Sequence, residues 1–288
     1  MSRVREMLLR HYKKIVFILS ITTLALAGLL LFQMDQLIHL KQQPLTHKQY
    51  IIKKRAIPVI GSEPELYMDI YPGDTIEKIA NRLEEKDIIV ADDFLSYLQK
   101  NEIYIKGNKY KKQDRRYILE GYFLPGTYGL FYGTSPQELC EIFIEPYLEW
   151  MKQKGNEQAL TIASIIEKEA AIDDDRYMIS GVIMNRIKEG MRLQIDATVL
   201  YALGYHKSLV TLEDLKINSP YNTYLINGLP PGPICTPSFQ SLEAALAPNT
   251  HSYFFYVVEA YGNPQHIFAK TYEEHLSNVE KYKQSKRK

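Results

Sequence analysis

The sequence predicts an α+β protein, because helix-like and strand-like patterns are mixed along its 288 residues without the strand–helix–strand rhythm of a parallel sheet. Apolar residues make up 45% and charged residues 24%, close to the globular average, which excludes a largely disordered chain and a protein with many membrane spans. The 35 basic and 34 acidic residues nearly cancel, so net charge gives no support for a nucleic-acid partner. Two cysteines are too few for a disulfide scaffold or a cysteine-rich zinc site, and Cys140 and Cys235 are expected to be unpaired.

One apolar segment is long enough to cross a membrane. Residues Ile15–Met34 carry no charge and, as a helix, would span about 30 Å, the thickness of a bilayer core. Basic residues dominate positions 1–14 and become sparse after the segment, so 1–14 is expected in the cytoplasm and the rest of the chain outside it. A cleaved signal peptide is the alternative, because Ala25–Ala27 resembles a cleavage site, but the segment stays apolar beyond it. The sequence therefore favours a retained single-pass anchor at 15–34, followed by a polar stalk at 35–60.

A small unit is predicted at 61–118. A strand candidate at 67–70 leads through a Pro-Gly turn to a helix, which begins at a capping box formed by Asp74 and Glu77. A second short helix follows at 92–99, and a basic stretch at 106–116 is expected to be a solvated loop or exposed strand. The order of strand and helices resembles a LysM module, a family of domains that bind N-acetylated glycans. A small packing subdomain without a ligand is the alternative.

A larger mixed α+β domain is predicted at 119–288. It opens with a turn-rich segment at 119–128 and an amphipathic helix at 135–150. The remaining pattern predicts helices at 157–171, 175–188, 198–203, 241–247 and 271–283, a Pro/Gly-rich loop at 221–237, and a hairpin from strands at 253–259 and 267–270.

The helix predicted at 157–171 is apolar nearly all round and is therefore expected to be buried. On a helical wheel, Glu167 lies among Leu160 and small alanines, and Glu169 lies near Ile162. Burial raises the pKa of a carboxyl group, as a general acid at neutral pH requires. The alternative for Glu167 is a glutamate that pairs with a buried arginine or caps a backbone group.

The two glutamates do not form the carboxylate pair of an ordinary glycosidase. Glu167 and Glu169 are two positions apart on a helix and point in roughly opposite directions, although Asp196 could supply a second carboxylate. The seven histidines form no pair at metal-ligand spacing, and the sequence contains neither a Gly-rich phosphate loop nor a nucleophile elbow. No metal or cofactor is therefore expected.

An ordered run of motifs resembles the YceG-like family of endolytic murein transglycosylases. It consists of IASIIEKE at 162–169, VIMNR at 182–186, MRLQ at 191–194, DATV at 196–199, SPYNTY at 219–224 and GLPPGPI at 228–234. The segment at 119–128, the closing hairpin and the last helix also match, so the resemblance covers nearly the whole chain. Gly126, Thr236 and Ser238 depart from the residues common in the family, and none of them is expected to touch the motif glutamate Glu167.

The resemblance implies an activity with one catalytic carboxylate, matched here to Glu167. This group would protonate the oxygen between N-acetylmuramic acid and N-acetylglucosamine, then take the proton from the muramic C6 hydroxyl as a 1,6-anhydro ring closes. Glu169 is expected to be structural, and Asn185 to tie helices together. Gln194, Asp196, Tyr221, Asn222 and Thr223 are expected to bind the sugars.

The implied partners are peptidoglycan glycan strands at the outer face of the cell membrane, together with peptidoglycan synthases of elongation or division. An inactive membrane-anchored glycan receptor and a hydrolytic muramidase are the alternatives.

Overall fold

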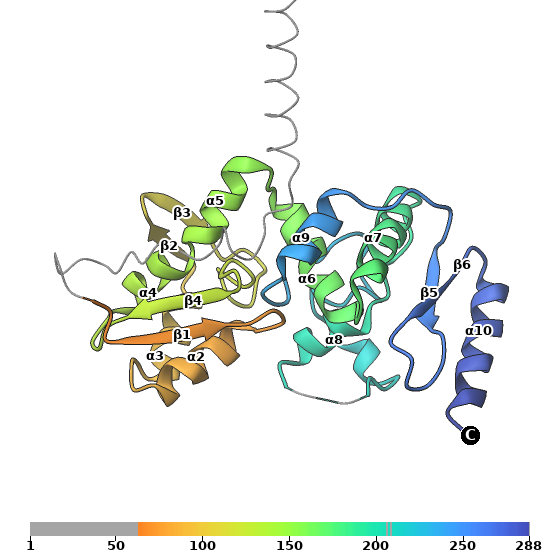
Figure 1. Cartoon of the computed structure of the whole chain (residues 1–288), viewed down its shortest axis with the longest axis horizontal. Coiled ribbons are helices and arrows are strands. Elements are labelled where there is room, and N and C mark those ends of the chain that lie inside the picture. The colour runs from red at the N-terminus through yellow and green to blue at the C-terminus, as the bar shows by residue number, and fades with distance from the viewer. Residues whose placement is uncertain (1–62, 206, 208, 288) are drawn as a thin grey trace, which may run out of the picture. The chain divides into compact units, whose positions relative to one another are not determined.

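Small antiparallel sheets and short helices make up the described part of the computed structural model, residues 63–205, 207 and 209–287 (Figure 1). This arrangement confirms the α+β class. The predicted segments at 1–14, 15–34 and 35–60 lie outside the described residues. Within the described residues, no helix combines the length and the apolar character needed to cross a bilayer.

The first half of the described chain is built around one two-stranded sheet. Strand β1 (Leu66–Ile70) pairs antiparallel with β4 (Gly126–Leu130), and their alternate side chains, Met68, Ile70, Tyr128 and Leu130, are buried. Between these strands the chain forms α2 (Ile76–Glu85), α3 (Ala91–Leu98) and the hairpin of β2 (Glu102–Ile105) with β3 (Asn108–Lys111). The partner of β1 therefore lies beyond residue 118, the predicted end of the small unit.

Two local predictions in this half are wrong. The side chain that caps α2 is that of Thr75, which accepts a hydrogen bond from the backbone N–H of Lys78. Asp74 instead accepts from the backbone of Tyr71 and forms an ion pair with Arg82 at 2.7 Å. The helix predicted at 135–150 is two helices, α4 (Pro136–Phe143) and α5 (Glu145–Gln153), because Pro146 has no N–H to continue the hydrogen-bond ladder.

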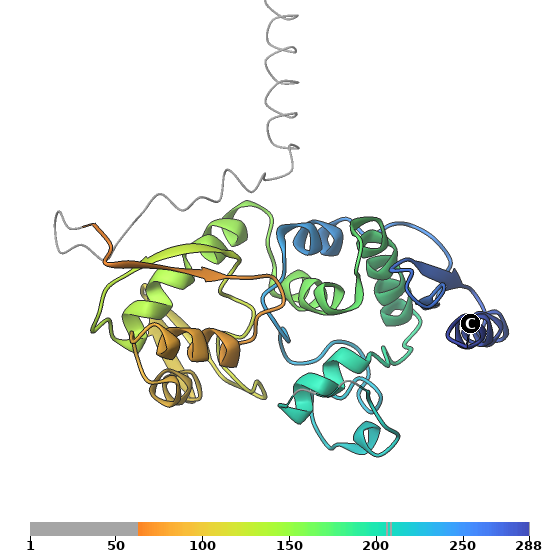
Figure 2. The ribbon, with the colours of Figure 1, turned by 60° about the horizontal axis from the view of Figure 1, so that its bottom comes forward.

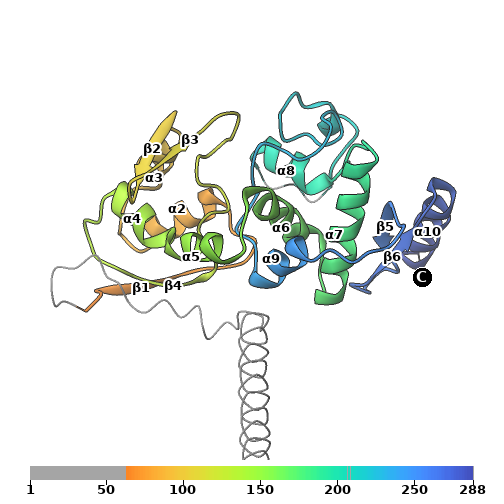
Figure 3. The same cartoon turned by 90° about the horizontal axis from the view of Figure 1, so that it is seen from above.

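The second half is mainly helical and closes with a hairpin. Its elements are α6 (Glu157–Glu169), α7 (Asp173–Lys188), α8 (Asp196–Leu203), the 3-10 turn η2 (Asp214–Lys216), α9 (Phe239–Leu246), β5 (Phe255–Val258), β6 (His266–Ala269) and α10 (Tyr272–Ser285). Helix α6 contacts α7, α8 and α9, and Figure 3 shows it among them. Every residue from Ala159 to Ile166 is buried, as the apolar pattern predicts. The hairpin and α10 lie beside α7, at the end away from α2 to α5 (Figure 2).

Hydrogen bonds around the start of α2 connect the first and second halves of the described chain. The backbone of Thr236 exchanges bonds with Gly73 at 2.8 Å and with Asp74 at 2.7 Å. The buried carboxyl of Glu120 accepts from the Ile76 N–H at 3.1 Å and from the Tyr201 hydroxyl at 3.0 Å. These contacts fix the start of α2 against α8. Cys140 and Cys235 are buried, and neither forms a disulfide within the described residues.

Candidate active site

Glu167 is enclosed by donors at the start of α9. Its Oε2 accepts from Nη1 of Arg176 at 3.1 Å, from the backbone N–H of Ser238 at 2.9 Å and from the hydroxyl of Ser241 at 2.7 Å. Ser238 is the N-cap residue of α9 and touches Glu167, contrary to the expectation from the sequence. Only 9% of the Glu167 side chain is exposed. These contacts match the alternative left open by the sequence, in which the glutamate pairs with a buried arginine and caps a helix start.

Glu169, at the last position of α6, has a different environment. Its Oε2 accepts from the Tyr256 hydroxyl at 3.0 Å, and the backbone N–H of Ala197, in the first turn of α8, donates to the same carboxylate. The pKa of Glu169 is raised to about 7, chiefly by burial and also by the charge of Asp196, while the two hydrogen bonds oppose the shift. A carboxyl group with this pKa is divided between its acid and base forms near neutral pH.

Glu169 lines a groove of about 490 Å³, whereas Glu167 is not among the residues that line it. The walls come from the end of α6, the inner face of α7, the segment 193–196, β5 and α10. Gln194, Asp196 and Tyr224 contribute polar groups to the same groove. Two of the predicted sugar-binding residues therefore lie in one groove with a titratable carboxyl group.

Arg186 holds two walls of this groove together. Its Nε donates to the carbonyl of Phe254 at 2.6 Å, and its Nη1 donates to the carbonyl of Leu193 at 2.6 Å. Burial lowers the pKa of Arg186, and its guanidinium lies 5.1 Å from the centre of the Phe255 ring. The contacts connect the segment before β5 to the segment that carries Gln194.

The YceG-like family model matches residues 46–281 of this sequence. The chain belongs to the YceG-like family. A relative named endolytic murein transglycosylase, from Bacillus subtilis, is 37% identical over 218 residues, which cover 71% of this chain and 60% of the relative. A protein of the same name from Streptococcus pneumoniae is 31% identical over 248 residues, covering 76% of this chain and 45% of the relative. The chain thus spans 60% and 45% of the length of these curated relatives.

A crystal structure of a YceG-like protein from Listeria monocytogenes has the same fold. It aligns with a TM-score of 0.64 at 35% sequence identity, covering 74% of this chain and 75% of that chain. The family assignment therefore has support from both the sequence and the structure.

Two family-motif residues predicted to bind sugars face the groove. The carboxylate of Asp196 accepts from the Tyr224 hydroxyl at 2.6 Å, and both side chains line the groove. Gln194 has a φ of 51°, in the left-handed region, and its backbone N–H donates to the carbonyl of Thr223 at 3.1 Å. A non-glycine residue in this region is held there by its surroundings, at a cost of about 1 kcal/mol.

The other three motif residues, Tyr221, Asn222 and Thr223, are buried and do not line the groove. Asn222 donates to the carbonyls of Leu215 and Ile217, both at 2.9 Å. The Thr223 hydroxyl accepts from the backbone N–H of Ile195 at 2.9 Å. Asn222 and Thr223 therefore support the segments that carry Gln194, Asp196 and Tyr224, and leave direct contact with a ligand to those neighbours.

Tyr224, Tyr256 and Arg186 belong to the site but were not predicted from the sequence. Tyr224 and Arg186 lie inside the family motifs, so their positions there could have identified them. Tyr256 lies outside these motifs and far from Glu169 in the sequence, and only the fold brings the two side chains together. Asn185 was expected to tie helices together; its side chain instead joins α7 to the segment before β5, donating to the carbonyls of His251 and Tyr253. Among the described residues, no group of three potential ligands could hold a metal ion.

Proposed function

We propose that this chain is a membrane-anchored endolytic lytic transglycosylase that cleaves peptidoglycan glycan strands, with Glu169 as its acid and base. The observation that carries the proposal is a carboxyl group of pKa about 7 in a groove with Asp196 and Gln194. Two relatives of this chain bear the name endolytic murein transglycosylase. Glu167, which the family motif matches to the catalytic position, stays the second candidate for this group, because its hydrogen bonds with Arg176, Ser238 and Ser241 all reach one oxygen, Oε2.

In the first step, protonated Glu169 gives its proton to the oxygen that bridges N-acetylmuramic acid and N-acetylglucosamine, and the bond from C1 of the muramic residue breaks. The hydroxyl of Tyr256 and the N–H of Ala197 stabilise the carboxylate that forms. The carboxylate of Asp196 faces the same groove and stabilises positive charge at C1.

In the second step, the Glu169 carboxylate takes the proton of the muramic C6 hydroxyl as its oxygen attacks C1. The product is a 1,6-anhydro ring, and Glu169 is again protonated. The nucleophile belongs to the substrate and is held at high effective concentration, so one carboxyl group can serve both steps.

A hydrolytic muramidase is the second candidate, because Asp196 lies in the same groove as Glu169 and could activate a water molecule. The products separate the two reactions. Long uncrosslinked strands should yield mid-length fragments with 1,6-anhydro ends at early times, as mass spectrometry can detect. Reducing muramic ends would contradict the lytic reaction, and disaccharides released from the outset would contradict endolytic cleavage.

The organisation of the chain is part of the same proposal. Residues 1–14 are cytoplasmic, 15–34 form the anchor, 35–60 form the stalk, 61–118 form a LysM-like unit, and 119–288 form the catalytic domain outside the cytoplasm. The uncharged run at 15–34 and its basic flank support the topology. A reporter fused after residue 288 should be active only if it works outside the cytoplasm; a mature protein that starts near Gly28 would contradict the anchor. At this location the enzyme can cleave strands made by neighbouring peptidoglycan synthases and so limit the length of the glycan strands.

A further inference from the structure

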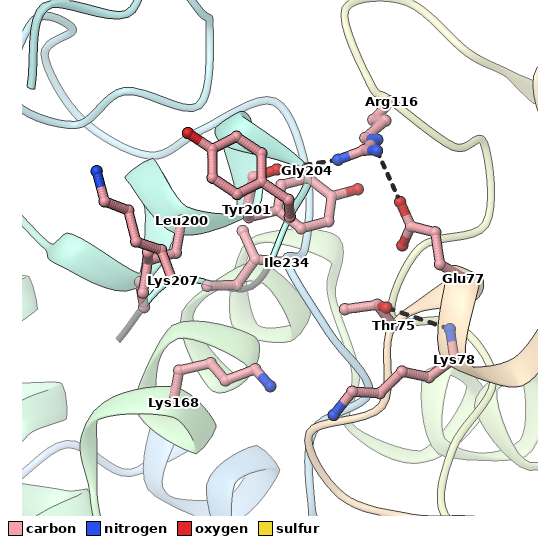
Figure 4. Close-up of a pocket in the computed structure, with 12 residues that line it drawn as sticks. Thr75, Glu77, Lys78, Arg116, Lys168, Leu200, Tyr201, Gly204, Lys207 and Ile234 are labelled. Carbon is pink, nitrogen blue, oxygen red and sulfur yellow. Dashed lines mark hydrogen bonds and ion pairs between the residues drawn. The ribbon is translucent and has the colours of Figure 1, made fainter. Parts of the chain in front are cut away.

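Figure 4 shows a second pocket, which has a volume of about 330 Å³. It is lined by the start of α2, the end of α6, and α8 with the turn that follows it. Lys168 and Glu169 are consecutive in α6 but enter different hollows: Lys168 lines this pocket and Glu169 lines the groove. Ala197 lines the pocket while its N–H bonds to Glu169. The pocket and the groove are therefore adjacent, on either side of the end of α6 and the start of α8.

The pocket carries an excess of positive charge. Its charged lining residues are one acid, Glu77, and four bases, Lys78, Arg116, Lys168 and Lys207. Arg116 is paired with Glu77 at 3.0 Å, and Lys207 is paired with Asp214.

Two lysines of the pocket have no acidic partner. Among the described residues, no carboxylate lies within ion-pair distance of Lys78 or Lys168. Lys168 donates only to the carbonyl of Gly73, at 2.6 Å. In Figure 4 the two side chains extend toward one another from α2 and α6. Two positive charges are thus available to an anionic ligand beside the N-terminus of α2, which also favours negative charge.

The rest of the pocket wall is apolar and firmly held. Leu200, Ile234 and the ring of Tyr201 form much of it. The Tyr201 hydroxyl donates to Glu120, whose other oxygen accepts from the start of α2, so the wall is fixed before any ligand arrives. A ligand that combines small apolar groups with carboxylates complements this surface.

We propose that this pocket binds the carboxylate-bearing stem peptide of the peptidoglycan strand cleaved at Glu169, a role that rests on the proposed function. A stem peptide offers methyl side chains to the apolar wall and carboxylates to Lys78 and Lys168. A phosphate group fits less well, because the guanidinium of Arg116 is already engaged by Glu77 and by the carbonyl of Tyr201. The pocket would make the enzyme prefer strands that still carry their peptides.

The test compares peptide-bearing strands with strands from which an amidase has removed the peptides. Lys78→Gln and Lys168→Gln should each lower kcat/KM on peptide-bearing strands by about twofold to fivefold, mainly through KM, the range expected for an exposed ion pair. Activity on peptide-free strands should not change. Lys152→Gln is the matched control, because this lysine on α5 is 72% exposed and lines neither the pocket nor the groove. Equal losses on both substrates, or no loss on either, would overturn the proposal.

Direct binding separates this proposal from the proposed reaction. A fluorescent muramyl tripeptide with free carboxylates should bind to the full-length Glu169→Gln protein more weakly after Lys78→Gln, and its amidated form should bind weakly to both. If pyrophosphate binds at this pocket and the tripeptide does not, the peptide assignment is wrong. If the wild-type enzyme makes no anhydro ends from peptide-bearing strands, the proposed reaction fails whatever the tripeptide does.

Discussion

Replacing Glu169 by Gln should stabilise the protein at alkaline pH. The pKa of Glu169 lies at about 7 in the folded chain, against an ordinary value of 4.5, because burial disfavours its ionised form. Each pKa unit corresponds to about 1.4 kcal/mol, so ionisation of this group costs the folded state about 3 kcal/mol. The preference of the folded state for protonated Glu169 therefore stabilises the protein fully below pH 4.5, and this contribution is lost as pH rises through 7. Glutamine has the same size, stays neutral and can still accept the Tyr256 hydrogen bond.

Urea unfolding of the two proteins at pH 4.5 and pH 8 measures this difference. Wild type and Glu169→Gln should have similar free energies of unfolding at pH 4.5, and the variant should be more stable by up to about 3 kcal/mol at pH 8. Glu167→Gln is the control, since it removes the carboxylate that Arg176 and Ser238 contact, and it should be less stable by about 1–3 kcal/mol at pH 8. A Glu169→Gln protein that is less stable than wild type at pH 8 would refute the reasoning.

Three further predictions concern the surroundings of the site. Tyr256→Phe removes a hydrogen bond that holds the pKa of Glu169 down, so the alkaline limb of the pH–activity profile should move up by about one pH unit; an unchanged or lower limb would contradict the contact. Asn222→Ala leaves two backbone carbonyls without their donor and should lower the free energy of unfolding by about 1–3 kcal/mol in urea titrations, whereas an unchanged value would show that the loop does not depend on Asn222. Cys140 and Cys235 are buried and burial raises the pKa of both thiols, so alkylation without reductant should label the denatured protein twice and the native protein hardly at all; unlabelled denatured protein would indicate a disulfide.

The local pattern of the sequence was sufficient to predict the helices of the second half. The apolar residues of 157–171 predict a buried helix, and α6 is buried from Ala159 to Ile166. The helix at 135–150 was predicted too long, because its apolar spacing continues through Pro146 although the backbone hydrogen bonds cannot. At the start of α2, Asp74 and Thr75 are both suitable caps, and the pairing of Asp74 with Arg82, on a later turn of α2, decides between them.

The roles of the site residues depended on contacts that the sequence does not contain. A helical wheel places Glu167 and Glu169 on different faces but does not reveal what each face meets. Arg176 and Ser238 contact Glu167, whereas Tyr256 and the start of α8 contact Glu169. Except for Arg176, on the next helix, these partners come from distant parts of the chain. The resemblance to the family suggested that Asn222 and Thr223 bind sugars, but their side chains satisfy backbone groups inside the fold instead.

One rate measurement tests the assignment of the catalytic acid most directly. The rate is that of 1,6-anhydro end formation from uncrosslinked strands, measured for wild type and for the folded Glu169→Gln and Glu167→Gln proteins. Glu169→Gln should lower the rate by about 10²–10⁴, because an amide cannot give and reclaim the proton. Glu167→Gln should keep most of the rate per folded molecule, since its carboxylate holds the start of α9 and does not line the groove. Full loss in Glu167→Gln with turnover retained in Glu169→Gln would contradict the account and return the catalytic role to Glu167.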